Sequence, residues 1–399
     1  MAADFDFFDP DFQKNIHSHF DRLRRECPVA HTDKPFEWFM VTREKDVRAI
    51  LNDSELWTSD QGPGLFYQPG AVLVSVDPPQ HTLDRRLVNR AFPPARLLAM
   101  EDDITKMVDE MMDTFVERGE GDLMELFAIP MPIIVIAWLL GLDPDYVLTI
   151  RPRADGMMAP DRTEPPPPDQ SNLESAGYFN SMLAERREAI AKGEDLPDDT
   201  LTMLVTSDLD GRTLTDEEVL GFMFFLFIAG SQTTTQLIGN LVYRLLQFPD
   251  QMEKLLARPD LLSNAVEESL RFDSPVNGLF RTNTRDVELH GVHLPKNSKV
   301  MCMFGSANLD PEFWDEPEKF DVERDFQKLK HHYAFGKGIH YCMGAPLARV
   351  EGRVALQRIL ERMPNLKLVG EPEEISAHVM HGVETLPVTW DPTPKRSTT

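Results

Sequence analysis

Phe335-Gly336-Lys337-Gly338-Ile339-His340-Tyr341-Cys342-Met343-Gly344 is the stretch that decides the fold, and it stands directly before an expected helix at residues 345–363. A cysteine just ahead of a helix N-terminus meets the positive end of the helix dipole and free backbone N–H groups, and both favour thiolate over thiol. Thiolate is the form that ligates a metal ion, and the glycines let the backbone bend around the sulfur. A single cysteine is more often a small buried apolar residue, so the surrounding pattern has to carry the assignment.

The composition predicts one large domain over residues 1–399, with flexible ends at about 1–10 and 391–399. The formal net charge of −25, from 41 Lys and Arg against 66 Asp and Glu, would repel both a nucleic-acid backbone and an anionic membrane surface. Only three cysteines occur, which argues against a disulfide framework and fits a reducing cytoplasm. The N-terminal residues lack the features of a signal peptide, and the apolar stretch 131–142 is too short to cross a bilayer. We therefore expect a soluble cytoplasmic protein that binds neither nucleic acid nor membrane.

The hydrophobic periodicity predicts a mainly α-helical fold with a small β-rich region. Amphipathic patterns indicate long helices at residues 97–118, 175–192 and 252–272. A strand is expected at 38–42, and Gly and Pro between apolar runs indicate a hairpin around 291–296.

Two segments read as loops. Residues 58–70 hold several glycines and aromatic side chains, and such a loop could wall a pocket. The prolines at 165–168 exclude a helix and favour a surface segment, which is either a spacer or a pocket lid.

The longest predicted helix begins at Thr215 with a capping box to Glu218 and extends to about Leu246. Residues 221–230 contain almost no polar side chain, which indicates burial on all sides, and the polar run 231–235 follows abruptly. Polar groups in a core need partners. Threonines there can bond back to carbonyls one turn earlier, or they can serve a site, and the segment alone leaves both interpretations open.

The cysteine segment resembles the haem-binding loop of the cytochrome P450 superfamily, F-x-x-G-x-H-x-C-x-G. All five specified positions match, at Phe335, Gly338, His340, Cys342 and Gly344, and Gly336 counts as a sixth match to this loop. At roughly one in twenty per position, six chance matches have a frequency on the order of 10⁻⁸ per window. The resemblance implies the P450 fold, a triangular helical prism, and one non-covalent haem b with Cys342 as the iron ligand. Around the macrocycle it places Phe335, Gly336, Gly344 and Ala229.

Two further motifs fit the same family. Glu268 and Arg271 match E-x-x-R, and their spacing puts both charges on one helix face, where alone they would form a surface ion pair of little value. The resemblance implies instead a buried pair joined by Arg324, with a structural role in support of the haem loop. It also implies four cationic groups for the haem propionates: His81, Arg85, Arg281 and His340. Without the family, His81 and Arg85 could equally belong to a solvated helix face.

Residues Ala229-Gly230-Ser231-Gln232-Thr233-Thr234 resemble the family's oxygen-binding motif, [AG]-G-x-[DE]-T-[TS], at every specified position but one. The resemblance implies that Gly230 leaves room for dioxygen and that Thr233 hydrogen-bonds at the oxygen site. Gln232 departs from the pattern, because its amide orients water but cannot titrate as the usual carboxylate does. We therefore expect a different route for protons.

The resemblance implies a monooxygenase that activates dioxygen and oxygenates a small to medium apolar organic substrate, such as a terpenoid, steroid, fatty acid or aromatic compound. The expected pocket is lined by Phe66, Phe225, Ile228, Ala229, Val276, Leu279, Val379 and Met380, although the same side chains could be ordinary core. A peroxide-driven peroxygenase, a redox-neutral haem-thiolate enzyme and a haem-binding sensor remain alternatives. The pair Gly230 and Thr233 favours dioxygen activation.

Such an enzyme needs an electron donor, and we expect a ferredoxin or flavodoxin with its NAD(P)H-dependent reductase. Despite the overall negative charge, cationic side chains gather on the segments expected nearest Cys342: Arg85, Arg86, Arg90, Lys328, Lys330, Lys337 and Arg349. A basic face of this kind would attract an acidic partner.

Overall fold

The computed structural model describes residues 5–7, 9, 11–12, 15–66, 72–150, 170–208, 211–375 and 379–396. Its α-helices are α2 (Ile16–Glu26), α3 (Glu44–Asn52), α4 (Gln80–Ala91), α5 (Pro94–Ala99), α6 (Glu101–Met112), α7 (Pro130–Leu140), α8 (Pro144–Ile150), α9 (Gln170–Lys192), α10 (Thr200–Thr206), α11 (Asp216–Gln247), α12 (Pro249–Ala257), α13 (Leu262–Phe272), α14 (Phe304–Ala307), α15 (Phe326–Leu329) and α16 (Ala345–Arg362). Short helical turns lie at η1 (Met124–Ala128), η3 (Pro259–Leu261) and η4 (Gly338–His340). The mainly helical fold that the sequence predicts is confirmed.

The strands form three small sheets. They are β1 (Val29–Thr32), β2 (Trp38–Val41), β3 (Trp57–Thr58), β4 (Glu120–Asp122), β5 (Gly278–Asn283), β6 (Val287–Leu289), β7 (Val292–Leu294), β8 (Lys299–Met303), β9 (Lys367–Leu368) and β10 (Pro387–Thr389). The largest sheet has the order β1-β2-β8-β5-β3, and within it only β2 and β8 run parallel. The second sheet is β4-β10-β9, and β6 with β7 forms the predicted hairpin.

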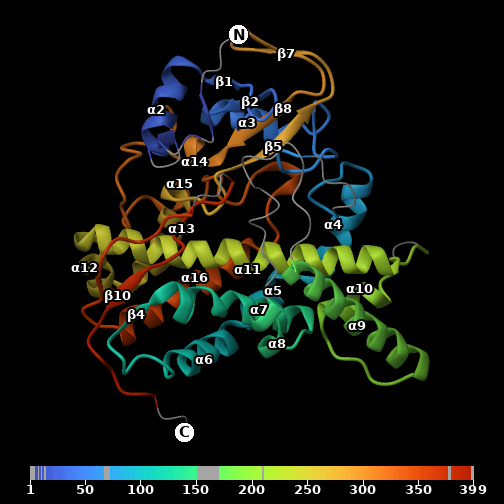
Figure 1. Ribbon diagram of the computed structural model, residues 1–399, viewed down its shortest axis with the longest axis vertical. Coiled ribbons are helices and arrows are strands. Elements are labelled where there is room, and N and C mark those ends of the chain that lie inside the picture. The colour runs from blue at the N-terminus through green and yellow to red at the C-terminus, as the bar shows by residue number, and fades with distance from the viewer. Residues whose placement is uncertain are drawn as a thin grey trace.

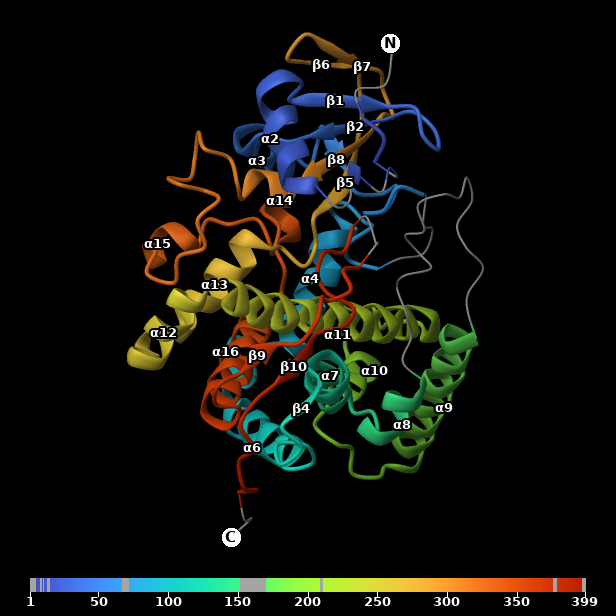
Figure 2. The same ribbon diagram turned by 60° about the vertical axis from the view of Figure 1, so that its left-hand side comes forward.

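Helix α11 crosses the middle of the molecule and divides it (Figures 1 and 2). The five-stranded sheet lies on one side with α2 and α3, and α6 to α9 lie on the other. The capping box expected at Thr215 is present, since its hydroxyl accepts from the Glu218 N–H at 3.2 Å and its own N–H donates to the Glu218 carboxylate at 2.9 Å. Helices α7, α9, α13 and α16 pack around α11, so its apolar sequence reflects burial on several sides.

Two of the expected long helices are interrupted. The segment 252–272 divides into α12 and α13, because Pro259 lacks an N–H and disfavours helical geometry at Arg258, whose φ and ψ are −137° and 79°. The segment 97–118 divides at Met100 into α5 and α6, and the second helix ends at Met112. Three acidic residues in the first turn of α6 favour a new helix N-terminus there.

Described residues near both chain ends make specific contacts. Phe5 and Phe7 are buried and contact the Trp38 ring edge-on, with centroids 5.4 and 5.5 Å away. Near the other end, Arg396 donates to Asp109 at 3.0 Å and to Glu361 at 2.8 Å. These described parts of both ends thus contact the rest of the chain, and the flexibility expected at about 1–10 and 391–399 stays a prediction.

The loop expected at residues 58–70 is described as far as Phe66. Lys299 of β8 donates to its carbonyls at Gln61, Gly62 and Gly64, at 2.9 to 3.4 Å, and burial lowers the pKa of this lysine to about 8. Phe66 is buried at the end of the described part. The sheet thus fixes this part of the loop, whereas the prolines at 165–168 lie outside the described residues.

An ion pair with no exposure to solvent ties α13 to the chain that leads into the cysteine segment. Arg271 donates twice to Glu268, at 2.7 and 2.8 Å, and Arg324 approaches the same carboxylate at 3.2 Å. Arg271 also donates to the carbonyls of Asn308, Pro317 and Lys319. The geometry of the buried, three-membered arrangement inferred from E-x-x-R is therefore present.

Among the described helices, none has both the length and the apolar composition needed to cross a bilayer.

We expect Arg271→Ala to lower the free energy of unfolding by about 3–5 kcal/mol, because it leaves a buried carboxylate short of its main partner. Arg25→Ala is the matched control, since Arg25 is exposed and its partner Asp21 is partly exposed; exposed pairs contribute about 0–1 kcal/mol. Denaturant unfolding followed by circular dichroism measures both. Equal losses in the two variants would show that burial of the pair has no influence.

Candidate functional site

The cysteine segment forms a tight turn between η4 and α16. The Cys342 N–H donates to the Phe335 carbonyl at 2.9 Å, and the Gly336 N–H donates to the Tyr333 carbonyl at 2.8 Å. Gly336 and Gly338 have φ of +67° and +69°, and a Cβ on Gly338 would collide with the Leu51 carbonyl oxygen. The backbone therefore requires glycine at both positions, as predicted.

Gly344 serves a different purpose from the other two glycines. Its φ is an ordinary −76°, so no bend requires it. A Cβ built on this residue would lie 3.8 Å from Cys342 Sγ. The absent side chain keeps the space beside the sulfur open.

The electrostatics of Cys342 only partly match the sequence-based expectation. The N–H groups of Gly344 and Ala345 point at the sulfur and favour thiolate, as do the charges of Arg85 and Arg349. The thiol is exposed, yet protein surrounds it closely enough that desolvation outweighs these effects and raises its pKa. The dipole and the N–H groups are therefore not sufficient to hold a thiolate, which requires a bound cation as well.

A second buried network of hydrogen bonds holds the cysteine segment in place, and the sequence analysis did not predict it. Glu267 accepts from His332 at 3.1 Å and from Arg349 of α16 at 2.5 and 3.0 Å. Although burial opposes ionisation, these donors lower the pKa of Glu267 to about 2. The Arg349 guanidinium lies over the Phe335 ring, 4.6 Å from its centroid. The available signal was a second glutamate directly before Glu268, which suggested only an exposed charge.

The cationic side chains matched to propionate binding converge. His81 and His340 have ring centroids 4.3 Å apart, and Arg85, Arg281 and His81 all depress the pKa of His340. Burial is the largest cause of that shift, which lowers the pKa of His340 to about 3, and it also lowers the pKa of the other three.

The charge of Asp77 acts on two of these four groups, His81 and Arg281. Among the described residues, no ion pair or hydrogen bond joins a carboxylate to any of them, and the buried His81 Nε2 has no partner. Arg281 donates only to the carbonyl of its neighbour Phe280, at 2.8 Å, and His340 meets the Ser59 hydroxyl at 3.1 Å. Two arginines and two imidazoles, all buried or half-buried, can donate hydrogen bonds to a dianionic group, whose charge would in turn favour protonation of the imidazoles.

The polar run 231–235 in α11 makes local hydrogen bonds, as expected if its hydroxyls bond back to carbonyls one turn earlier. The Thr233 hydroxyl donates to the Ala229 carbonyl at 2.8 Å, and the Ser231 hydroxyl donates to the Phe227 carbonyl at 2.8 Å. Each hydroxyl keeps its lone pairs as acceptors. Ala229 is exposed although it lies in the middle of a helix with many buried residues, and Gln232 and Thr233 are half-buried. This part of α11 therefore presents accessible groups and is not solid core.

The expected role of Gly230 in leaving room for dioxygen stays a prediction, and the structure adds a packing role. A Cβ at this position would lie 2.9 Å from Cδ1 of Ile136 in α7, a distance that real Cβ atoms do not tolerate. The missing side chain thus allows α11 and α7 to approach closely. Its neighbour Ala229 is exposed.

The residues expected to line an apolar pocket fall into two groups. Val276 and Met380 form a β-bridge, Val379 accepts from the Asn277 N–H at 2.7 Å, and Leu279 belongs to the same cluster as Val276 and Val379. Phe225 packs with the helices around α11, and Phe66 contacts Phe36 with centroids 5.9 Å apart. For Ile228, no contact among the described residues joins it to either group, so the contacts only partly bring the expected lining together.

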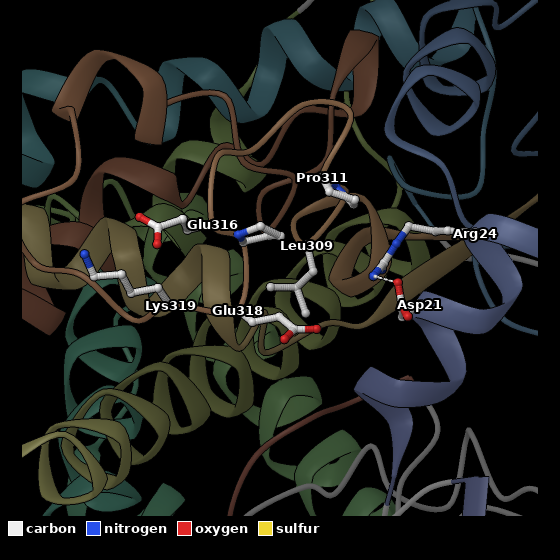
Figure 3. A pocket seen from close by; sticks show the side chains of 8 residues that line it. Asp21, Arg24, Leu309, Pro311, Glu316, Glu318 and Lys319 are labelled. Atoms are coloured by element: carbon white, nitrogen blue, oxygen red, sulfur yellow. Dashed lines mark ion pairs between the residues drawn. The ribbon is translucent and has the colours of Figure 1, made fainter.

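A cavity of about 550 Å³ elsewhere in the molecule is not a candidate for the same chemistry (Figure 3). It lies between α2 and residues 309–319 and is lined largely by charged side chains, including Asp21, Arg24 and Glu318. Arg24 and Asp21 form an ion pair at 3.9 Å across part of it. An apolar organic molecule would gain little from burial there.

Comparison with known proteins assigns the family. The family model for "Cytochrome P450" matches residues 171–374. Cytochrome P450 107B1 of Saccharopolyspora erythraea is 34% identical over 402 aligned residues, which cover 96% of each chain. The chain belongs to the cytochrome P450 family.

Other P450s agree in sequence and in structure. The Vitamin D(3) 25-hydroxylase of Pseudonocardia autotrophica is 35% identical and is covered to 96%, with 97% of this chain aligned. The crystal structure of CYP109E1 from Bacillus megaterium in complex with testosterone superposes with a TM-score of 0.85 at 30% identity, covering 96% of this chain and 99% of that one. The P450 fold is therefore confirmed, and the chain is a P450 monooxygenase.

Haem iron is the cofactor of P450s, and the described residues fit it. A thiol whose pKa burial has raised would be stabilised as thiolate by ligation to a cation. The cluster of His81, Arg85, Arg281 and His340 fits the propionate groups in charge and donor chemistry. Ligand and counterions thus come from separate segments, and the fold brings them together.

We expect Cys342→Ala to abolish the strongly red-shifted Soret band that a thiolate-ligated haem gives with carbon monoxide after reduction. The other cysteines, Cys27 and Cys302, lie in α2's C-cap and in β8, and neither precedes a long helix. Cys302→Ala serves as the control and should keep the band. A red-shifted band in Cys342→Ala would assign the iron ligand elsewhere.

Proposed function

We propose that this P450 holds one haem b without covalent attachment, activates dioxygen, and hydroxylates an apolar polycyclic substrate of steroid-like size. The observation that carries the proposal is the cluster of His81, Arg85, Arg281 and His340 beside the Cys342 turn, in which the buried His81 Nε2 lacks a partner among the described residues and Arg85 acts on the thiol. When bound, the haem supplies the oxygen chemistry. The protein supplies the ligand, the counterions, the substrate contacts and the protons.

The substrate class rests on apolar side chains and on relatives. Val276, Leu279, Val379 and Met380 come from β5, the residues before it and the segment after residue 378, and they offer almost no hydrogen bonds. One relative is named for vitamin D(3), and one similar structure holds testosterone. Both compounds are rigid and largely apolar, so an apolar lining with few polar groups would suit either.

The proposal predicts that testosterone or vitamin D(3) shifts the ferric haem spectrum from low to high spin at micromolar concentration, because burial of the ligand excludes water from the iron. Leu279→Glu should weaken this binding by tenfold or more, since it places a charge in the lining. Ile190→Glu, on the exposed face of α9, is the control. A titration with no spectral change for steroids, together with a clear change for fatty acids, would exclude the steroid class.

Proton delivery is proposed to run through hydroxyls and water and not through a side-chain acid at position 232. The Thr233 hydroxyl donates to Ala229 and so can accept at the oxygen site. Gln232 is half-buried and has both a donor and an acceptor with which to position water. A carboxylate in its place would add an acid that titrates.

We expect Thr233→Ala to divert most reducing equivalents to hydrogen peroxide, whereas Gln232→Glu changes the rate of product formation only modestly. General acid catalysis typically contributes about 10²–10⁴-fold, so a gain of about a hundredfold in Gln232→Glu would show that the native chain lacks a working proton route. Product formed per NAD(P)H consumed, with the solvent isotope effect, measures both variants. Full coupling in Thr233→Ala would remove this hydroxyl from proton delivery.

An acidic ferredoxin or flavodoxin, with its NAD(P)H-dependent reductase, is the proposed electron donor. A groove of about 520 Å³ lies beside the cysteine turn and is lined by Leu98, Phe326, Lys330, Tyr341, Arg349 and Arg353, among others. Of the seven side chains expected on the basic face, Arg349 pairs with Glu267 and Arg85 is half-buried in the cationic cluster, whereas Arg86, Arg90 and Lys330 are exposed.

Docking should therefore depend on the exposed lysine that remains in this groove. We expect Lys330→Glu to slow reduction by the partner and to weaken its dependence on ionic strength, because long-range attraction is lost. Lys296→Glu, at the exposed hairpin of β6 and β7, is a control with the same charge change. Stopped-flow reduction under carbon monoxide measures the rates, and equal effects of the two variants would argue against docking at this groove.

A peroxide-driven reaction is the second candidate. It would share the Cys342 turn and the cationic cluster, but it needs neither the electron donor nor the Thr233 route. Turnover with hydrogen peroxide alone, at a rate that matches the reduced partner, would favour it.

A further inference from the structure

Three side chains with metal-ligand chemistry meet at a point where three separate segments join. His17 lies on α2, Asp273 follows the end of α13, and His381 lies in the segment after residue 378. One ligand atom from each falls within 4.8 Å of the others. His17 Nε2 and His381 Nε2 lie 3.8 and 3.0 Å from the same oxygen, Oδ1 of Asp273. The three therefore converge on one small volume.

The His17 imidazole and the Asp273 carboxylate are in forms that can bind a metal ion. Burial lowers the pKa of His17 to about 4, so its ring is neutral and keeps a free lone pair near neutral pH. Burial opposes ionisation of Asp273, but Arg244 and His381 outweigh it and hold its pKa well below the ordinary value. Neutral imidazole with carboxylate is the ligand chemistry of Zn²⁺.

Among the residues that the structure describes, the His17 side chain has no hydrogen-bond partner. Its 3.8 Å approach to Asp273 is too long for one. Ligands of a tetrahedral zinc ion lie roughly 3.3 Å apart, given bonds of about 2.0–2.1 Å. The two contacts to Asp273 bracket this value, so small side-chain rotations would bring both nitrogens to one ion.

Arg244 is the group that opposes a cation here. It donates to both carboxylate oxygens of Asp273, through Nε to Oδ2 and through Nη2 to Oδ1 at 3.0 Å. The charge of Glu374 acts on Arg244 as well and partly offsets it. Oδ1 still has a lone pair after its bond to Arg244, and an arginine behind a ligating carboxylate orients it as an outer-shell partner.

We propose that His17, Asp273 and His381 form a site for a transition-metal ion of the Zn²⁺ class, independent of the haem. Metal binding would break the His381–Asp273 hydrogen bond, and His381 would carry its proton on Nδ1 instead. Water completes the coordination, because His17 keeps about a third of its side chain exposed. The ion would tie α2 to the chain beside Met380, which bridges Val276.

The test uses the haem-loaded protein, stripped with EDTA and dialysed against micromolar ZnCl₂. Elemental analysis then gives zinc per haem iron, and the iron counts the protein. The expected result is one zinc per iron in the wild type and a loss of affinity of about tenfold or more in His17→Gln and in His381→Gln. His293→Gln, an exposed histidine of β7, should bind zinc like the wild type.

Two measurements keep the outcome interpretable. The carbon monoxide spectrum shows that each variant still holds haem in the native fold. X-ray absorption spectroscopy at the zinc edge should show nitrogen and oxygen neighbours near 2.0 Å and no sulfur at about 2.3 Å. The proposal would be overturned by wild-type protein that lacks stoichiometric zinc, by histidine variants that bind zinc as tightly as the wild type, or by a sulfur neighbour of the zinc.

Discussion

Two adjacent glutamates in the middle of one helix, α13, hold the position of the cysteine turn. Glu268 accepts from Arg271 and Arg324 and so fixes residues 308–324, while Glu267 accepts from His332 and Arg349 and so fixes both sides of the turn. Both carboxylates are buried. Because removal of any partner would leave a buried charge uncompensated, each network tolerates only one arrangement. The position of the turn that presents the thiol is therefore fixed by the two glutamates of α13.

The Cys342 thiol and the cluster of His81, Arg85, Arg281 and His340 include buried polar groups that the described residues leave without full compensation. Burial raises the pKa of Cys342 and lowers that of His340, and His81 Nε2 is left without a partner. Each of these costs stability in the absence of a ligand. Haem has a central cation that can bind the Cys342 sulfur and peripheral carboxylates that can accept hydrogen bonds from His81 and His340. Its binding would therefore remove each of these costs.

Helix α11 shows how a single segment meets structural and chemical needs together. The Thr233 and Ser231 hydroxyls satisfy their own donors within the helix, which lets polar residues lie in a core without a cost in unmade bonds. Gly230 permits close contact with α7, and the turn still exposes Ala229. The structural and functional interpretations of this segment are thus not alternatives, because the donor side of each hydroxyl serves the helix and the acceptor side is available to chemistry.

The sequence by itself determined the features that are local. The capping box at Thr215, the turn glycines at Gly336 and Gly338, and the cysteine before α16 depend on neighbours within a few residues, so their spacing carried the prediction. Tertiary structure alone decided that Glu267 is a buried partner of Arg349, that Gly230 faces Ile136, and that His17 meets Asp273 and His381. Those contacts join residues tens to hundreds of positions apart. Their existence depends on how helices pack and on which charges become buried, and no local pattern specifies either.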